Sequence, residues 1–165
     1  MRFEEFVDAN MEALSRYARV LSGDRQAAHD LLADTLVAAS SRWAKIGRMD
    51  SPAVYVRRMI TNRHIDQSRR AKTRKRALAL LEAVPPPVFD ATHTIDQRHY
   101  LDGLLRDLPV RQRAALVLRF YLALTDEEIA AELRIHVGSV RSSISRGLST
   151  LRSKTTDQEL RTHLP

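Results

Sequence analysis

The 165-residue chain contains no cysteine, only five glycines, and aromatic residues at just 5% of its positions. The lack of cysteine excludes disulfide bonds, thiolate metal sites and cysteine nucleophiles. No window approaches the ~18 consecutive apolar residues that a membrane-spanning helix needs. The N-terminal stretch MRFEEFVDAN has acidic residues where a signal peptide carries positive charge followed by an apolar run. We therefore expect a cytoplasmic protein without a membrane-inserted segment.

Catalytic signatures are also missing from the sequence. It contains no glycine-rich phosphate loop, no HExxH zinc helix and no GxSxG elbow. The six histidines are scattered, and the nearest pair, His93 and His99, does not have the i,i+4 spacing that places two imidazoles on one helical face. We therefore expect no enzymatic activity, no cofactor and no metal site.

What the chain does contain is positive charge and helix-forming sequence. The formal net charge of +7 implies a polyanionic partner, which could be nucleic acid, acidic lipid or an acidic protein surface. A hydrophobic content of 44% is sufficient for a core. Runs that alternate Val, Ile or Thr with polar residues are absent, which argues against β-sheets. The expected fold class is all-α, with two small helical domains.

A helix-turn-helix is predicted between Thr125 and Arg152. Thr125 followed by Glu128 has the capping-box pattern of a helix start. After the turn, apolar residues recur at helical spacing from Val140 to Leu151 and predict a second helix with one buried stripe. The opposite face of that helix has cations and hydroxyls but no acids, which suits phosphates and base edges in a DNA major groove. The first helix of this motif carries the carboxylates of Asp126, Glu127, Glu128 and Glu132 at its N-terminus. The helix macrodipole favours negative charge there, so these residues need no catalytic role.

Two further helices are predicted at the start of the chain. The first extends from Phe3 to Leu21. Asp24 then serves as the N-cap of the second, which runs to about Trp43. The spacing of apolar residues predicts which side chains lie on the inner side of the second helix: Ala28, Leu31, Leu32, Thr35, Ala39 and Trp43. On its outer face Asp30 and Asp34 are four residues apart and therefore neighbours, and from spacing alone this acidic strip is simply a solvated surface.

A basic helix is predicted to begin at Pro52. Ser51 caps it, and proline is tolerated at the first helical position. From Arg57 to Arg76 there are nine Lys or Arg residues against the single acid Asp66. Because this positive run continues an amphipathic helix rather than a tail, we favour a nucleic-acid-binding face over a merely solvated one.

Domain boundaries follow from the composition. Residues 77–97 are almost free of cations and contain a triple proline, so we interpret them as a linker between a first domain, residues 1–76, and a second, residues 98–155. In the second domain a helix ending at Pro109 and another reaching Tyr121 are predicted before the helix-turn-helix. Residues 156–165 form a polar tail that we expect to fray, as does the chain beyond Arg152 generally.

The ordered set of motifs resembles the two-domain extracytoplasmic-function sigma factors of bacterial RNA polymerase. The segment GDRQAAHDLLADTLVAASSRW is similar to the family's clamp-binding segment, and SPAVYVRRMITNRHIDQSRR to its promoter-melting and minus-ten helix. The segments LPVRQRAALVLRFYLALTDEEIAAEL and VGSVRSSISRGLSTLR are similar to its minus-thirty-five-reading domain. The sequence of the last segment, VGSVRSSISRGLSTLR, looks like that of the SigE-type subgroup.

This resemblance implies three contact sites. It assigns core polymerase binding to Asp30, Leu31, Leu32, Asp34 and Thr35, which would turn the acidic strip into an exposed docking surface. It assigns minus-ten DNA to Arg58, Asn62, Arg63, Asp66, Arg69 and Arg70, with base capture by the loop from Ile46 to Ser51. It assigns the minus-thirty-five major groove to Ser139, Arg141, Ser142, Ser145 and Arg146.

The implied function is that of a transcription initiation factor whose binding energy helps to open the minus-ten region. The implied partners are the clamp and flap of core RNA polymerase and promoter DNA, and an anti-sigma factor is a further candidate partner. The alternative is a polymerase-independent helix-turn-helix regulator that binds duplex operators as a dimer.

The chain also departs from the family pattern. Ala33 and Leu36 replace the usual glutamine and phenylalanine of the clamp motif, which removes a hydrogen-bonding group and some apolar area. In the turn, Arg134 stands where glycine is common and His136 where a serine-like cap is common. A left-handed Arg134 would cost roughly 1 kcal/mol relative to glycine, which a packed domain tolerates.

Overall fold

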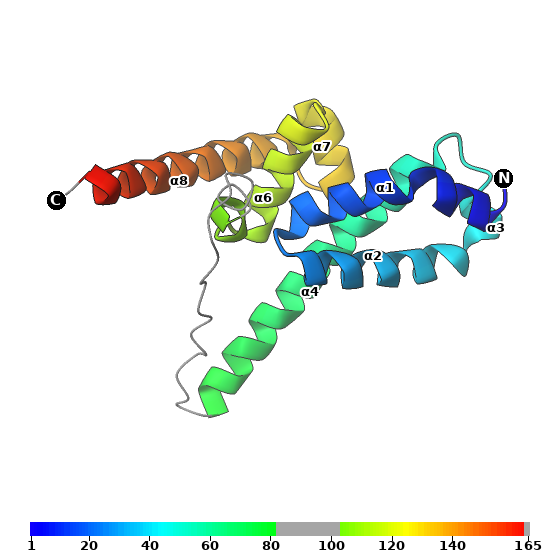
Figure 1. Cartoon of the computed structure of the whole chain (residues 1–165), viewed down its shortest axis with the longest axis horizontal. Coiled ribbons are helices and arrows are strands. Elements are labelled where there is room, and N and C mark those ends of the chain that lie inside the picture. Colours follow the sequence, from blue (N-terminus) through cyan, green and yellow to red (C-terminus); the bar gives the residue numbers. More distant parts are fainter. Residues whose placement is uncertain (82–102, 164–165) are drawn as a thin grey trace.

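The computed structural model describes residues 1–81 and 103–163, and within them every regular element is a helix (Figure 1). This confirms the all-α prediction. The elements are α1 (Phe3–Ser22), α2 (Arg25–Ser40), α3 (Trp43–Ile46), α4 (Pro52–Leu81), α6 (Val110–Leu116), the π-helical η1 (Val117–Tyr121), α7 (Asp126–Leu133) and α8 (Val137–His163). Residues 103–106 form a further helical turn. We refer to α1–α4 as the first module and to the elements from residue 103 onward as the second module.

Gly23 and the predicted N-cap Asp24 make the junction between α1 and α2. Gly23 ends α1 in a left-handed conformation, φ 70°, and its amide donates to the carbonyl of Arg19 at 2.9 Å. The Asp24 carboxylate then accepts from the amide of Ala27 at 2.7 Å and caps α2. Helix α2 ends at Ser40 rather than near Trp43, because the chain turns there into the separate helix α3.

Trp43 begins α3 and anchors it to α1. Its ring lies 5.2 Å from that of Phe3, edge-on, and 4.7 Å from that of Phe6, centroid to centroid. Buried side chains of α1, α2 and α4 complete the core of the first module, among them Phe6, Leu21, Leu31, Val56 and Ile60. One polar link runs through this core, from the hydroxyl of Tyr17 to that of Thr61 at 2.7 Å. Burial raises the pKa of Tyr17, so its hydroxyl stays protonated.

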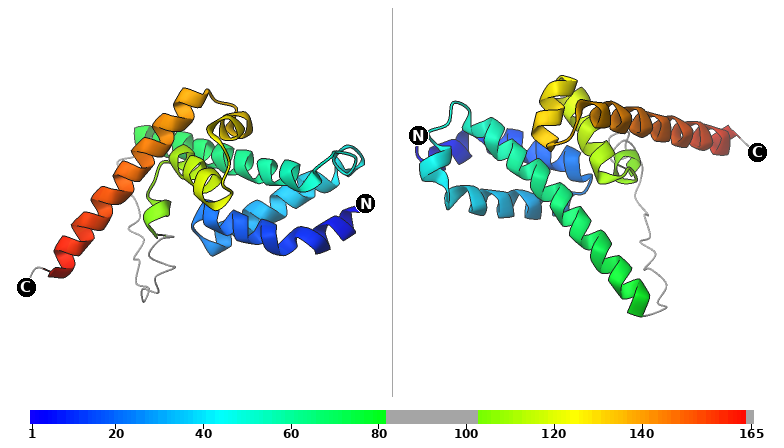
Figure 2. Two further views of the ribbon diagram at one scale, coloured as in Figure 1. Left: turned by 90° about the horizontal axis from the view of Figure 1, so that it is seen from above. Right: turned by 180° about the vertical axis from the view of Figure 1, so that it is seen from behind.

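Helix α4 begins at Pro52, as predicted, but is longer than expected. It continues to Leu81, through residues 77–81 that we had assigned to the linker. The extension is rich in alanine and leucine, two strong helix formers, and no proline follows until Pro85. Its end projects away from the rest of the protein (Figures 1 and 2). The triple proline and the remainder of the assigned linker lie outside the described residues.

The second module contains the predicted helix-turn-helix. The hydroxyl of Thr125 accepts from the amide of Glu128 at 3.2 Å, and the Glu128 carboxylate accepts from the amide of Thr125 at 2.8 Å, which completes the capping box. Arg134 adopts the left-handed conformation expected of it, φ 54°. Before α7, the expected single helix from Pro109 to Tyr121 is divided into α6 and η1, because the amide of Leu122 bonds five residues back to Val117.

Helix α8 extends to His163, so the prediction of a frayed segment beyond Arg152 is wrong. Hydroxyl groups along this stretch bond to carbonyls three or four residues earlier and leave the helical backbone intact; the donors include Ser153 and Thr155. Lys154 also reaches Asp107, 2.6 Å away, and fixes α8 to the start of the second module. No helix in the described part of the chain is long and apolar enough to cross a membrane.

The two modules pack against each other. Buried residues of α6, η1, α7 and α8, including Leu118, Ile129 and Val140, belong to the same apolar cluster as Ile60 and Ile65 of α4. Figures 1 and 2 show α6 and α7 beside the first half of α4, and the α6 residue Arg113 bonds to the end of α1 at Ser22. The sequence did not predict this contact between modules.

Candidate nucleic-acid interface

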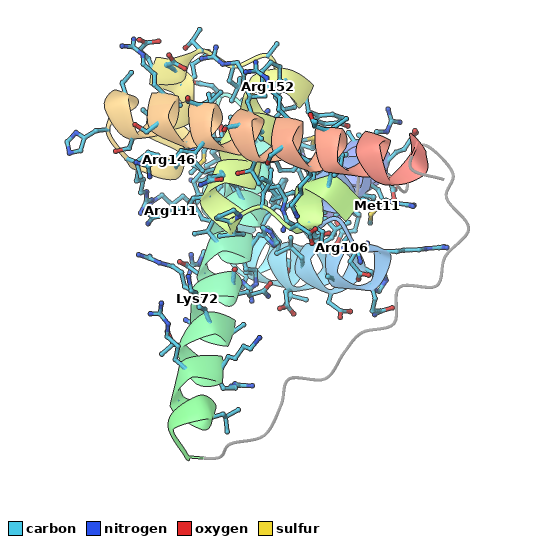
Figure 3. The ribbon with its side chains drawn as sticks, turned by 90° about the vertical axis from the view of Figure 1, so that its left-hand side faces the viewer. Met11, Lys72, Arg106, Arg111, Arg146 and Arg152 are labelled. Atoms are coloured by element: carbon cyan, nitrogen blue, oxygen red, sulfur yellow. The ribbon has the colours of Figure 1, made fainter. Side chains whose placement is uncertain are left out.

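The outer face of α8 is available to DNA. All five residues assigned to the minus-thirty-five groove are exposed: Ser139, Arg141, Ser142, Ser145 and Arg146. On the opposite side Val140 is fully buried, and Ile144, Leu148 and Leu151 pack on the two apolar clusters of the structure. The predicted apolar stripe is therefore confirmed, and it turns the polar face outward. In Figure 3, Arg146 of α8, Arg111 of α6 and Lys72 of α4 follow one another down one side of the view.

Asp126 orients one of these outer residues. Its carboxylate accepts from Nε of Arg141 at 3.0 Å and also pairs with the guanidinium of Arg119. The side chain of Arg141 remains 68% exposed, while that of Asp126 is only 18% exposed. Asp126 therefore links η1, α7 and α8, a role beyond the macrodipole effect that its sequence position indicated.

The basic face of α4 lines a cleft. All six residues assigned to minus-ten DNA take part in its wall: Arg58, Asn62, Arg63, Asp66, Arg69 and Arg70. The cleft has a volume of about 740 Å³. Three of these residues, Asp66, Arg69 and Arg70, are exposed, and the other three are partly covered. The six residues that the sequence placed along one helix therefore line the same cleft in the structure.

The opposite wall of this cleft comes from the second module. It includes Arg111 of α6 and the turn of the helix-turn-helix, from Leu133 to Ile135. No sequence pattern connected these residues with α4. Their convergence depends on the packing of the two modules.

The acidic strip of α2 is only partly exposed. Asp30 and Asp34 are exposed, as is Val37 beside them, whose exposed fraction is 70%. In contrast Leu31, Leu32 and Thr35 are buried, at 1%, 6% and 0% exposure, so the expectation that they lie on an exposed docking face is wrong. They occupy the inner side of α2, as helical spacing had indicated. Asp34 is engaged by Arg63, whose Nε lies 3.5 Å away.

The loop expected to capture a flipped base is also partly closed. Ile46 is 1% exposed and belongs to the core, so it cannot present a surface to a base in this arrangement. The next residue, Gly47, packs closely against the Trp43 ring. Any larger residue at this position would place its Cβ only 3.0 Å from the indole nitrogen. The exposed part of the loop begins after these two residues.

Two polar links that sequence analysis missed connect the modules. Glu132 of α7 accepts from both Nε and Nη2 of Arg57 of α4, at 3.4 and 3.2 Å. Arg113 of α6 donates to the carbonyls of Leu21 and Ser22 at 3.3 and 2.7 Å. Neither partner pair is close in sequence, so no local pattern could have indicated them.

Arg113 is the more buried of the two arginines and is 6% exposed. Its guanidinium also donates within its own module, to the carbonyls of Arg106 and Leu108 at 2.6 and 3.4 Å. Burial lowers the pKa of Arg113. Burial and the nearby Arg113 charge together lower the pKa of His64 in α4 to about 4, so this imidazole is neutral at pH 7.

Both modules are similar to known protein families. Residues 98–151 match the family described as Sigma-70, region 4, and residues 7–61 match the Sigma2 domain of PhyR. An RNA polymerase sigma-E factor of Streptomyces coelicolor is 34% identical over 97% of this chain and 89% of its own length. The ECF RNA polymerase sigma factor SigM of Mycobacterium tuberculosis is 31% identical over 90% of this chain and 74% of its own length.

Solved structures share the fold. The sigma factor RpoE of Bartonella quintana, in complex with the anti-sigma factor NepR, matches 92% of this chain and 94% of its own, with a TM-score of 0.64 and 23% identity. CnrH, in complex with the cytosolic domain of CnrY, matches 94% of this chain and 88% of its own, with a TM-score of 0.58 and 21% identity. At these identities the likeness concerns the fold.

Proposed function

The chain belongs to the extracytoplasmic-function family of RNA polymerase sigma factors, and we propose which of its surfaces performs each step of initiation. It is a transcription initiation factor that binds core RNA polymerase, recognises the minus-thirty-five and minus-ten promoter elements and promotes promoter melting. The polymerase-independent regulator is not favoured, because the similarity to sigma-E factors extends over nearly the whole chain.

The observation that carries our assignment is the separation of two DNA-suited surfaces onto two modules. We assign minus-ten binding to the six cleft-lining residues of α4 and minus-thirty-five binding to the exposed face of α8. In domain terms, residues 1–76 act as sigma region 2 and residues 98–155 as sigma region 4; of the linker assigned between them, residues 77–81 extend α4. This division keeps all the minus-ten residues on one helix.

On α4, arginines would hold the phosphates of the opened strand, while Asn62 and Asp66 offer groups for base edges. Unstacking a base costs a few kcal/mol, and the phosphate contacts offset this cost. Melting would thus be driven by binding energy alone. We propose that the protein catalyses no reaction itself and acts in the cytoplasm, where its polymerase and promoter partners are.

On α8, three serines and two arginines form the assigned face. Such a face has no Asn or Gln for bidentate contacts with adenine. Phosphate contacts and DNA shape therefore supply much of the recognition, with Arg141 and Arg146 as the residues able to pair with guanine.

Core polymerase binding is assigned to the exposed part of the acidic strip, Asp30 and Asp34. The buried residues Leu31, Leu32 and Thr35 would act indirectly, by fixing α2 against α1 and α4. Core polymerase presents its clamp to this strip and its flap to the second module. An anti-sigma factor is a further candidate partner, because RpoE of Bartonella quintana is bound to one.

A reconstituted transcription assay tests the assignment. Core polymerase supplemented with this chain should initiate at promoters selected from a randomised duplex pool, while core polymerase alone should not. A variant with Arg69→Ala and Arg70→Ala should retain core binding and minus-thirty-five binding but fail to open the minus-ten region, as followed by permanganate reactivity of unpaired thymines. Normal opening by this variant would contradict the role given to α4.

A further inference from the structure

We propose that the cleft between α4 and the second module is a binding site for a short phosphate chain, and that a bound chain holds the two modules together. The shared chemistry of the ligand is a linear run of phosphates, as in inorganic tripolyphosphate or a nucleoside triphosphate. This site shares its α4 wall with the minus-ten contacts assigned above, but it differs from them because it also requires Arg111 and Arg134 of the second module.

The charge of the cleft points to an anion. Arginines outnumber carboxylates seven to two among its lining residues; the arginines are Arg42, Arg58, Arg63, Arg69, Arg70, Arg111 and Arg134. One of the two carboxylates, Asp34, is already paired with Arg63 at 3.5 Å. Among the side chains that the structure describes, those of residues 1–78 and 103–156, no ion pair involves the other six guanidinium groups. The cleft therefore has a large excess of uncompensated positive charge.

Arg58 lies where such a ligand would bind. Its Nε is buried and has no hydrogen-bond partner in the described protein, although the residue lines the cleft. An unsatisfied buried donor costs about 1–3 kcal/mol, and more where the group is charged. A phosphate oxygen is the acceptor that a guanidinium binds most readily, through two parallel N–H groups.

The two walls repel each other when the cleft is empty. Arg111 and Arg134 of the second module face the arginines of α4 across it. Like charges brought together in a partly enclosed space are unfavourable, and a phosphate chain between them would convert this repulsion into attraction. The volume of about 740 Å³ is within the range of small-ligand sites and accommodates a chain of three phosphates.

Occupancy has a consequence for promoter binding. The two promoter elements are separated by roughly 25 base pairs, or about 85 Å at 3.4 Å per pair. Modules that share one apolar core cannot bind both elements at that separation, so they have to come apart. A ligand that binds both walls favours the packed arrangement and opposes this separation.

Titration calorimetry of the intact chain with tripolyphosphate tests the site without polymerase or DNA, so its outcome is independent of the promoter assignments. We expect saturable binding at one site per chain. Arg111→Ala combined with Arg134→Ala should weaken it at least tenfold. The control is Arg25→Ala combined with Arg152→Ala, which also removes two exposed arginines, but both lie outside the cleft, and this variant should bind like the parent.

Equal weakening in both double variants would show mere counter-ion attraction and overturn the proposal, as would unchanged binding in the cleft variant. Far-ultraviolet circular dichroism confirms that both variants are folded. A parallel titration with ATP distinguishes the sources: equal affinities indicate an inorganic chain, and tighter ATP binding that depends on the same arginines indicates a nucleotide. Small-angle scattering should show a smaller radius of gyration with tripolyphosphate than without it, and no such change would also overturn the proposal.

Discussion

Glu132 and Arg57 form an ion pair across the boundary between the modules, with both guanidinium–carboxylate distances between 3.2 and 3.4 Å. The Glu132 side chain is 3% exposed and that of Arg57 is 18% exposed. Two charges so far removed from water depend on each other, because either one alone would be buried without compensation.

Neutralising one partner should therefore be costly. Glu132→Gln is expected to lower the free energy of unfolding by about 3 kcal/mol, as measured by urea denaturation. The double variant Glu132→Leu with Arg57→Met removes both charges and should recover most of the loss. If the single and double variants are equally unstable, the contribution of Glu132 to the free energy of unfolding does not come from its ion pair with Arg57.

The pKa of His64 gives the protein a pH dependence. Its folded pKa of about 4 lies below the unfolded value of 6.5, so the unfolded chain binds the proton more readily. Stability is thus full above pH 6.5 and falls as the pH drops toward 4. Between pH 7 and pH 5 we expect a loss on the order of 2 kcal/mol from this group. Urea titrations at pH 7 and pH 5 measure this loss of unfolding free energy, and His64→Gln should remove the contribution of the imidazole. An unchanged pH dependence in this variant would contradict the role given to His64.

Asp126 should assist DNA binding although it is negative. Asp126→Asn removes a negative charge near the DNA face, so electrostatics alone predicts tighter binding. We expect the opposite, about tenfold weaker binding of a minus-thirty-five duplex, because Arg141 loses the carboxylate that orients it. Glu127→Gln is the matched control: the same change one residue away, on an exposed side chain, should leave the affinity equal or slightly higher. Tighter binding by the Asp126 variant would exclude the orienting role.

The acidic strip can be tested by charge reversal. Asp30→Lys combined with Asp34→Lys should abolish the binding of core polymerase in a pull-down or interferometry assay, while circular dichroism stays unchanged because both residues are exposed. Glu4→Lys combined with Asp8→Lys reverses two exposed acids at the same spacing on α1 and should retain binding. Retained affinity in the α2 variant would remove these residues from the interface.

The sequence predicted most local features correctly because caps and turns are short-range. Asp24, Pro52 and Thr125 begin helices as expected, and Arg134 takes the left-handed conformation that the motif requires. The predicted ends of α4 and α8 were less accurate. Both helices continue beyond the predicted end, because no proline or glycine stops them there.

The candidate site was predicted in parts but not as a whole. Each basic or hydroxyl-rich face was visible as a helical pattern. The contact between faces was not, because Arg57 and Glu132 are 75 residues apart and neither is unusual in its own helix. The clamp motif shows a related effect: resemblance placed Leu31 and Leu32 on the surface, while their own periodicity correctly placed them inside.

The last turn of α1 is completed by another module. Its terminal carbonyls, Leu21 and Ser22, would otherwise lack partners, and Arg113 supplies the donors that a local cap would provide. Separation of the modules would return these carbonyls to water and loosen the turn. Faster amide hydrogen exchange near Gly23 would then report the open population directly, at a position remote from the α4 and α8 faces assigned to DNA.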